Sequence, residues 1–220
     1  MSALIMVAVV ALAIYTNVPT KITSTDVAVF TELGLERPFE PQTFDQELAL
    51  IRKVQYVVFK RAPLSVVGIP EFESREPIDL MRYGKGLCYD RSRTFDKALS
   101  YLGLETRHVY LLYRDGRSFW GALIHYGQPS HAVTEVKTSR GWMFVDSNTE
   151  WIALTRQGEP VSADEVWQRY AEFDHAPHYL AAPWWALRGV YSRKGQFYGA
   201  GVMFPELNWP DFARWLVSGK

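Results

Sequence analysis

Apolar side chains recur at helical spacing along the stretch that begins at Thr43. Thr43-x-x-Gln46 has the pattern of a capping box, which closes the start of a helix. Because Pro63 cannot continue a helix, the sequence predicts one helix that starts at Thr43 and stops before Pro63. Gln55 is a polar residue on its otherwise apolar face. A second, shorter helix is expected over 78–83, where it runs into a Gly-Lys-Gly break.

A further helical pattern runs from Leu87 to Leu102, and Gly103 then supplies the residue that commonly ends a helix. Cys88 falls in the first turn of this helix and on its apolar face, so its thiol is predicted to point inward. Free N–H groups and the helix dipole at that end favour a thiolate and lower the thiol pKa. The alternative is an inert buried cysteine, which is what most lone cysteines are.

Downstream of Gly103 the pattern changes to one that is typical of strands. Glu105–Tyr113 and Ser118–Tyr126 are predicted strands, and the four residues 114–117 between them form a hairpin turn signal. His108 and His125 fall within these strands, where we interpret them as structural residues. The sequence therefore predicts an antiparallel hairpin over 105–126.

A second hairpin is predicted between Ser130–Val136 and Trp142–Asp146. If its loop pairs Thr138 with the glycine three places on, His131 and Asp146 fall on the same face as diagonal neighbours. A slip of one residue would put them on opposite faces. The expected register therefore brings a histidine and a carboxylate within reach of each other.

A cysteine at a helix start thus precedes a His and an Asp that a hairpin can bring together. Cysteine attacks as the thiolate, histidine takes and returns the proton, and a carboxylate holds the ring tautomer. We therefore predict Cys88, His131 and Asp146 as catalytic residues. The backbone N–H of Cys88 is a candidate oxyanion donor. Gln55 is a candidate side-chain donor and Tyr83 its rival, although Gln55 could simply bond to nearby backbone.

Composition limits the other possibilities. Hydrophobic residues make up 48% of the 220 residues and the net charge is zero, which fits a globular protein and gives no basic surface for nucleic acid. The single cysteine excludes an intrachain disulfide framework and a Cys-rich zinc module. His175-x-x-His178 could suggest a metal pair, but Pro177 breaks the helical spacing. No metal or cofactor is therefore expected.

The N-terminal part contains an unbroken apolar run, Ala3–Tyr15, with no Lys or Arg before Lys21. Its 13 residues are fewer than the roughly 20 needed to span a bilayer. A signal peptide or a short anchor that continues to Val18 is expected, with a buried N-terminal strand or helix as the alternative. Export or membrane attachment would place the catalytic domain outside the cytoplasm. The expected organisation is a signal or anchor over 1–18, a linker with at most one short strand over 19–42, a catalytic core over 43–155 and an aromatic-rich extension over 156–220.

Three blocks of sequence resemble the transglutaminase-like superfamily. They are Gly86-Leu87-Cys88 with the Leu102–Arg107 stretch that ends the helix, His131-Ala132-Val133-Thr134-Glu135-Val136, and Gly141-Trp142-Met143-Phe144-Val145-Asp146. The resemblance covers roughly 43–152. It implies a papain-like α+β fold, with the nucleophile helix packed on an antiparallel sheet, and a Cys88–His131–Asp146 triad. Val133 and Ser147-Asn148 depart from the family pattern at positions that shape the pocket rather than move protons.

These features predict a thiol-dependent amide hydrolase or acyltransferase that forms an acyl-enzyme on Cys88, with a peptide or protein amide as substrate. Peptide hydrolysis is favoured over crosslinking, because nothing in the sequence supplies the calcium sites of the animal crosslinking enzymes. The alternative is a catalytically inactive module that binds peptide or glycan in an aromatic cleft.

For two other groups of residues the sequence predicts a structural role. The charged residues on the Cys88 helix are expected to form its solvated face; they are Arg91, Arg93, Asp96 and Lys97. The aromatic residues between Trp184 and Trp215 are expected to pack as a cover over the core. An aromatic wall beside the cleft and a contact with a membrane interface are the alternatives for this region.

Overall fold

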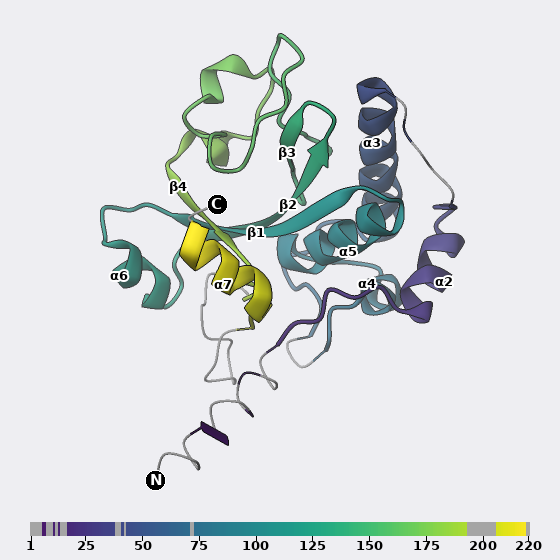
Figure 1. Ribbon diagram of the computed structural model, residues 1–220, viewed down its shortest axis with the longest axis horizontal. Coiled ribbons are helices and arrows are strands. Elements are labelled where there is room, and N and C mark those ends of the chain that lie inside the picture. The colour runs from purple at the N-terminus through teal and green to yellow at the C-terminus, as the bar shows by residue number, and fades with distance from the viewer. Residues whose placement is uncertain are drawn as a thin grey trace.

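The computed structural model describes residues 17–37, 41, 43–70, 73–192 and 206–218, together with positions 6, 7, 11 and 13. Helices gather around one small sheet (Figure 1). The helices are α2 (Ser24–Glu32), α3 (Phe44–Arg61), α4 (Pro77–Tyr83), α5 (Cys88–Tyr101), α6 (Phe119–Ile124) and α7 (Trp209–Ser218). The strands are β1 (Glu105–Tyr113), β2 (Ser130–Thr138), β3 (Gly141–Val145) and β4 (Trp184–Arg188). The short 3-10 helices η1 (Tyr170–Glu172) and η2 (His178–Ala181) lie between β3 and β4.

The strands form one antiparallel sheet in the order β3-β2-β1-β4. The β2–β3 hairpin pairs Thr138 with Gly141 and Thr134 with Val145, which is the register expected from the turn. Helix α5 packs against β1 and β2, and α3 and α4 pack against α5. This combination of helices with an antiparallel sheet confirms the predicted α+β class.

The hairpin predicted over 105–126 is wrong, because its second half is helix α6 and the turn after it. The Ser118 side chain accepts a hydrogen bond from the backbone N–H of Gly121, which caps a helix start. Ala122 and Leu123 then pack inward beside β4. The periodicity of a short apolar run does not distinguish a helix from a strand. Here the edge of β1 that the predicted strand would have filled pairs with β4 of the C-terminal extension.

The expected linker over 19–42 contains helix α2 instead of a short strand. Thr23 caps this helix: its hydroxyl accepts from the backbone N–H of Asp26, and its own N–H donates to the Asp26 carboxylate at 2.8 Å. Val29 and Phe30 are buried in the core cluster that also holds α5. The Thr-x-x-Asp pattern was the local sign of this helix.

The chain after β3 covers one face of the sheet. Val109 and Leu111 of β1 point to that face and pack against buried apolar residues from positions 153–184. Tyr110 and Leu112 alternate with them, so they point to the other face and pack with α6, β4 and Leu207. The described part of the C-terminal extension therefore packs as a cover over the core.

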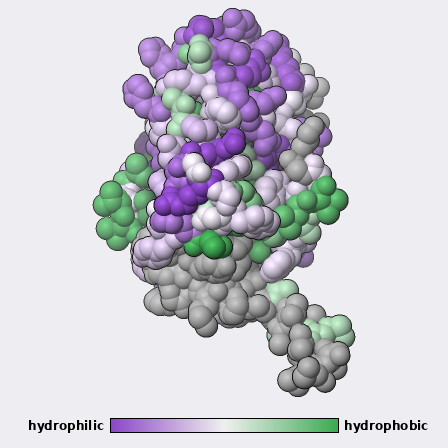
Figure 2. Space-filling model, turned by 90° about the vertical axis from the view of Figure 1, so that its left-hand side faces the viewer, coloured by the Kyte–Doolittle hydropathy of each residue, from purple (hydrophilic) through white to green (hydrophobic). Residues whose placement is uncertain are grey.

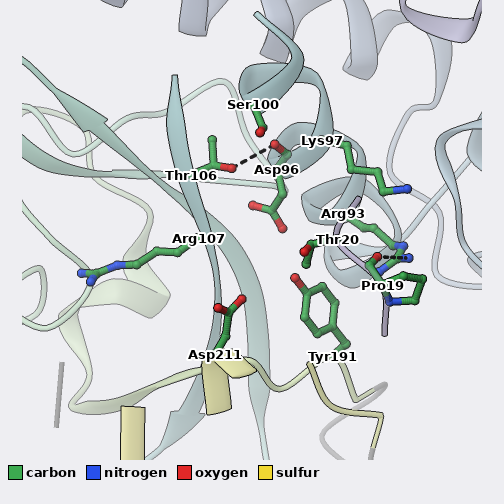
Figure 3. Close-up of a pocket in the computed structure, with 10 residues that line it drawn as sticks. All are labelled: Pro19, Thr20, Arg93, Asp96, Lys97, Ser100, Thr106, Arg107, Tyr191 and Asp211. Carbon is green, nitrogen blue, oxygen red and sulfur yellow. Dashed lines mark hydrogen bonds between the residues drawn. The ribbon is translucent and has the colours of Figure 1, made fainter. Parts of the chain in front are cut away.

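Helix α5 is buried on nearly every side, which corrects the expected solvated face. The charged residues concerned are each less than a tenth exposed: Arg91, Arg93, Asp96 and Lys97. Lys97 Nζ donates to Asp26 Oδ2 at 2.9 Å, and Arg93 and Lys97 both bind the Glu76 carboxylate. Their acidic partners come from α2 and from the start of α4. This pairing offsets the free-energy cost of removing the charged groups from water. Arg93, Asp96 and Lys97 help to line a pocket of about 210 Å³. Figure 3 shows these side chains together with the other residues of the lining.

The two expected terminal features are only partly described. The signal or anchor over 1–18 lies largely outside the described residues, and so does the aromatic stretch 193–205. Val18 is held beside the start of α7, because its N–H donates to Leu207 O at 2.7 Å and its carbonyl accepts from Asn208 Nδ2 at 2.9 Å. Within the described ranges, no helix is both long and apolar enough to cross a membrane.

Candidate active site

Cys88 is the first residue of α5 and is half-buried. Leu87 before it has extended backbone, and its N–H donates to Asp90 Oδ2 at 2.8 Å, which closes the first turn. A Cβ at Gly86 would lie 2.7 Å from Leu80 Cδ1 and 3.1 Å from Asp90 Cβ. Any larger residue at position 86 would therefore have to displace the buried Leu80 side chain, so glycine is favoured where the chain enters the helix. These contacts fix the cysteine at the helix N-terminus.

His131 lies in β2, and Asp146 directly follows β3. The hairpin brings them to one face, where His131 Nε2 lies 2.6 Å from Asp146 Oδ1. Their side chains are 5% and 0% exposed. The backbone N–H and the hydroxyl of Thr149 donate to Asp146 Oδ2 at 2.8 and 2.7 Å. Both carboxylate oxygens are thus engaged, so the carboxylate can hold the imidazole in one orientation.

The Cys88 thiol is hydrogen-bonded to His131. Because Nε2 of the ring faces Asp146, Nδ1 is the nitrogen left for the sulfur. The sulfur also accepts from the backbone N–H groups of Tyr89, in the first turn of α5, and of Ala132, beside the histidine. The structure therefore brings the three predicted residues together in one chain of hydrogen bonds.

The charges of these groups stabilise one another. Burial alone would raise the pKa of the Cys88 thiol, but the hydrogen bond and positive charge of His131, with the two backbone N–H groups, lower the pKa below its ordinary value. Burial would lower the pKa of His131, but Asp146 and Cys88 raise it to about 10. Burial would raise the pKa of Asp146, but His131 and Thr149 hold it low. Together these shifts favour a thiolate–imidazolium pair at neutral pH.

Tyr179, from η2, is a site residue that the sequence motifs did not indicate. Its hydroxyl lies 3.4 Å from His131 Nε2 and is hydrogen-bonded to the Asp146 carboxylate. Its ring stands edge-on to the imidazole, with the ring centroids 5.0 Å apart. Burial and the Asp146 charge raise the pKa of Tyr179, so the phenol stays protonated and donates. The C-terminal extension therefore contributes directly to the site.

Arg91, one turn beyond Cys88 on α5, is a buried cation beside these groups. Its side chain Nη2 donates to Asn148 Oδ1 at 2.7 Å, and its guanidinium lies 4.9 Å from the Phe59 ring centroid. Burial lowers the pKa of Arg91, while the negative charges of Cys88 and Asp146 act to raise it. A fixed positive charge therefore acts on both the thiolate and the carboxylate.

The two side chains considered as oxyanion donors are already occupied. Gln55 Nε2 donates to Asp146 O at 3.0 Å and to Trp151 O at 3.1 Å. Gln55 thus supports the segment that carries Asp146, which is the alternative interpretation of this residue. The Tyr83 hydroxyl donates to Glu73 Oε1 at 2.8 Å. Neither group offers a free donor, whereas the helix start leaves the Cys88 N–H without an intrahelical acceptor.

The remaining histidines lie outside this group. His108 is buried in β1, with Nδ1 2.8 Å from Asp96 Oδ2 and its ring stacked on Tyr191 at 4.0 Å. His125, expected in a strand, is the exposed residue that ends α6, and its Nε2 lies 3.1 Å from Arg117 Nη2. Across the described ranges, no three His, Cys, Asp or Glu side chains gather in a way that could hold a metal ion.

Residues 41–147 match the family model of the transglutaminase-like superfamily. No curated protein matches the chain. One similar solved structure is a candidate cysteine protease from Cytophaga hutchinsonii, with 14% identity over 56% of this chain and 36% of that chain and a TM-score of 0.37. A TGase has 16% identity over 58% of this chain and 34% of that chain, with a TM-score of 0.38. An arylamine N-acetyltransferase from Bacillus cereus has 18% identity over 57% of this chain and 49% of that chain, with a TM-score of 0.37. This chain covers less than half of each of these three structures. The segment 41–147, which contains Cys88, His131 and Asp146 and makes up just under half of the chain, is therefore of the transglutaminase-like superfamily.

Proposed function

We propose that the protein is a thiol-dependent amide hydrolase or acyltransferase that works through an acyl-enzyme on Cys88. The observation that carries the proposal is the buried His131–Asp146 pair, 2.6 Å from Nε2 to Oδ1, whose imidazole also interacts with Cys88 at the first residue of α5. In this arrangement Cys88 is the nucleophile, His131 is the base and acid, and Asp146 orients the imidazole. Tyr179 acts through Asp146 and is a positioning residue.

The reaction begins when the Cys88 thiolate attacks the carbonyl carbon of an amide, and the C=O electron pair moves onto oxygen. The backbone N–H of Cys88 is the proposed donor to that oxyanion. Protonated His131 gives its Nδ1 proton to the leaving nitrogen as the C–N bond breaks, which leaves a thioester on Cys88. Water then attacks the thioester while His131 takes a proton from it, and the acid leaves. An amine in place of water would give acyl transfer.

Hydrolysis of peptide or protein amides is the finer form of this proposal. It is supported by the burial at the site, because Cys88 is partly buried while His131 and Asp146 are almost fully covered, so the nucleophile is the most accessible member of the triad. Nucleic acid is not a proposed partner, because the chain carries no net charge. Action outside the cytoplasm is proposed from the apolar run Ala3–Tyr15 alone.

The test combines a thiol probe with a substrate screen. Iodoacetamide should label Cys88 quickly in the unmodified protein and slowly in His131→Ala. A peptide library should yield a mass-shifted thioester on Cys88 and cleaved products, both absent from Cys88→Ala, and an added amine should report transfer. Equal slow labelling of both proteins without turnover would contradict the proposal and favour a catalytically inactive module that binds peptide or glycan.

A further inference from the structure

Helices α6 and α7 lie side by side and share an aromatic cluster. The Phe119 ring of α6 lies 6.0 Å from Trp215 of α7 and 5.6 Å from Trp185 of β4, and Phe212 stacks on Trp215 at 5.8 Å. These contacts attach both helices to the sheet. The aromatic cluster therefore joins the two helices to each other.

These helices and the turn after α6 carry large apolar residues that contact solvent. We call them the α6–α7 patch: Trp120 (63% exposed), Ile124 (62%), Tyr126 (79%), Leu216 (52%) and Val217 (91%). Figure 2 shows the side of the molecule on which α6 lies: its upper part is mainly hydrophilic, and its strongly apolar residues lie in groups at the two sides and near the centre. An apolar surface of this kind marks an interaction site in a soluble domain.

The chain that follows the apolar N-terminal run is attached to the folded body beside the start of α7 (Figure 1). Val18 is hydrogen-bonded to Leu207 and Asn208, and α7 begins at the next residue. The run Ala3–Tyr15 comes just before this attachment. Two described residues of the run are themselves exposed: Met6 and Val7, each at 66%. In sequence, the apolar run therefore leads directly into the segment that is held beside the first turn of α7, the helix that carries Leu216 and Val217.

We propose that the α6–α7 patch is a bilayer-contacting surface, which lies in the interface of a lipid membrane beside the N-terminal run. Trp120 and Tyr126 have the amphipathic rings that favour the headgroup level, and Ile124, Leu216 and Val217 supply apolar groups for the acyl boundary. A single weak anchor gives only reversible membrane binding, so a second contact from the folded body makes attachment stable. This inference does not depend on the reaction proposed for Cys88.

The charges near the patch indicate which force drives the binding. Arg117 is paired with Asp115, and Arg214 Nη1 lies 3.6 Å from Asp211 Oδ1. The nearby Arg114 guanidinium lies over the Trp185 ring, 5.2 Å from its centroid. Because two of these three cations have acidic partners, burial of apolar area should dominate over attraction to anionic lipid. Binding should therefore be similar on phosphatidylcholine vesicles and on vesicles that also contain phosphatidylglycerol, and salt should change it little.

Hydrogen exchange on the full chain, with and without phosphatidylcholine vesicles, tests the contact. Vesicles should slow the exchange of peptides that cover 119–126 and 209–218 and leave those of α3 unchanged. The double variant Ile124→Asp, Leu216→Asp should lose this protection and bind vesicles about tenfold more weakly. The control Tyr56→Glu changes a residue of α3 that is 51% exposed, on the far side from α6 in Figure 1, and should bind as the unmodified protein does.

Three results would overturn the proposal. Protection limited to residues before 17 would mean that only the N-terminal run enters the bilayer. Protection of 119–126 without vesicles that grows with protein concentration would mean that a second copy covers the patch. Equal vesicle binding by the double variant and the control would mean that the patch adds nothing. Circular dichroism of both variants shows whether the fold is kept, and Trp120→Ser provides a milder change if the double variant does not fold.

Discussion

The Tyr179 hydroxyl lies 3.4 Å from His131 Nε2, the same ring nitrogen that meets Asp146 Oδ1 at 2.6 Å. Because that nitrogen donates to Asp146 when the ring is charged, the tyrosine donates to the carboxylate and not to the ring. It thereby stabilises the negative charge of Asp146 together with Thr149. A residue from the C-terminal extension thus sets the geometry of a pair from the superfamily core.

Tyr179→Phe removes this hydroxyl and keeps the ring that packs on His131. We expect kcat to fall about tenfold with little change in KM, because a hydrogen bond to a charged carboxylate is lost. The acid limb of the pH profile should move to higher pH, because Asp146 loses a donor that lowers its pKa. Tyr170→Phe is the matched control, since its hydroxyl donates to Ala176 O at 3.2 Å. Equal kinetics in the two variants would show that Tyr179 only packs.

The pH dependence of Cys88 alkylation follows from the shifted pKa values. His131 lowers the pKa of the Cys88 thiol, so the thiolate persists as pH falls and is lost only below that lowered value. The pKa of His131 is raised to about 10, so its positive charge is lost only as pH rises through about 10. Iodoacetamide should therefore already react rapidly at about pH 6, where an ordinary thiol is almost wholly protonated. In His131→Ala the rate should rise only near the ordinary thiol pKa; a single rise there in both proteins would contradict the ion pair.

Asp146→Asn keeps the shape of the carboxylate but removes its charge. We expect turnover to fall by several orders of magnitude, because the amide permits the wrong imidazole tautomer. The pKa of His131 should fall from about 10, because Asp146 is the main cause of its rise. NMR titration of the His131 ring measures this shift without a substrate. An unchanged ring titration would mean that Asp146 does not stabilise the imidazolium.

Gly86→Ala tests how the chain enters α5. The added Cβ would come within 2.7 Å of Leu80 Cδ1, and Leu80 is fully buried. We expect a loss of about 1–3 kcal/mol in the free energy of unfolding, as is typical of overpacking. Denaturant unfolding measures the loss. The double variant Gly86→Ala, Leu80→Ala should lose less than the sum of the two single changes, and simple additivity would show that the two side chains do not collide.

The parts of the fold that the sequence predicted are specified locally. Helix α3 is closed by Thr43 through a side-chain bond to its own first turn, and Gly103 ends the Cys88 helix. The β2–β3 register follows from one tight turn, which is why the meeting of His131 and Asp146 could be expected. These features depend on residues that lie close together in the chain.

The parts that were missed depend on distant residues. Strand β4 pairs with β1 across a long separation, and the short run 118–126 became a helix once that edge was filled. Arg93 and Lys97 looked like solvated residues because their partners Asp26 and Glu76 lie in other helices. Tyr179 gave no signal at all, since only the packing of η2 brings it to the site.

The pairing of β1 with β4 also affects how the protein is made. During synthesis β1 leaves the ribosome well before Trp184–Arg188, so one edge of β1 stays without its partner for much of translation. An open strand edge is a template for pairing with other chains. The nascent superfamily core is therefore vulnerable to aggregation until the extension arrives. A chaperone that shields strand edges should raise the yield of folded protein most during that interval.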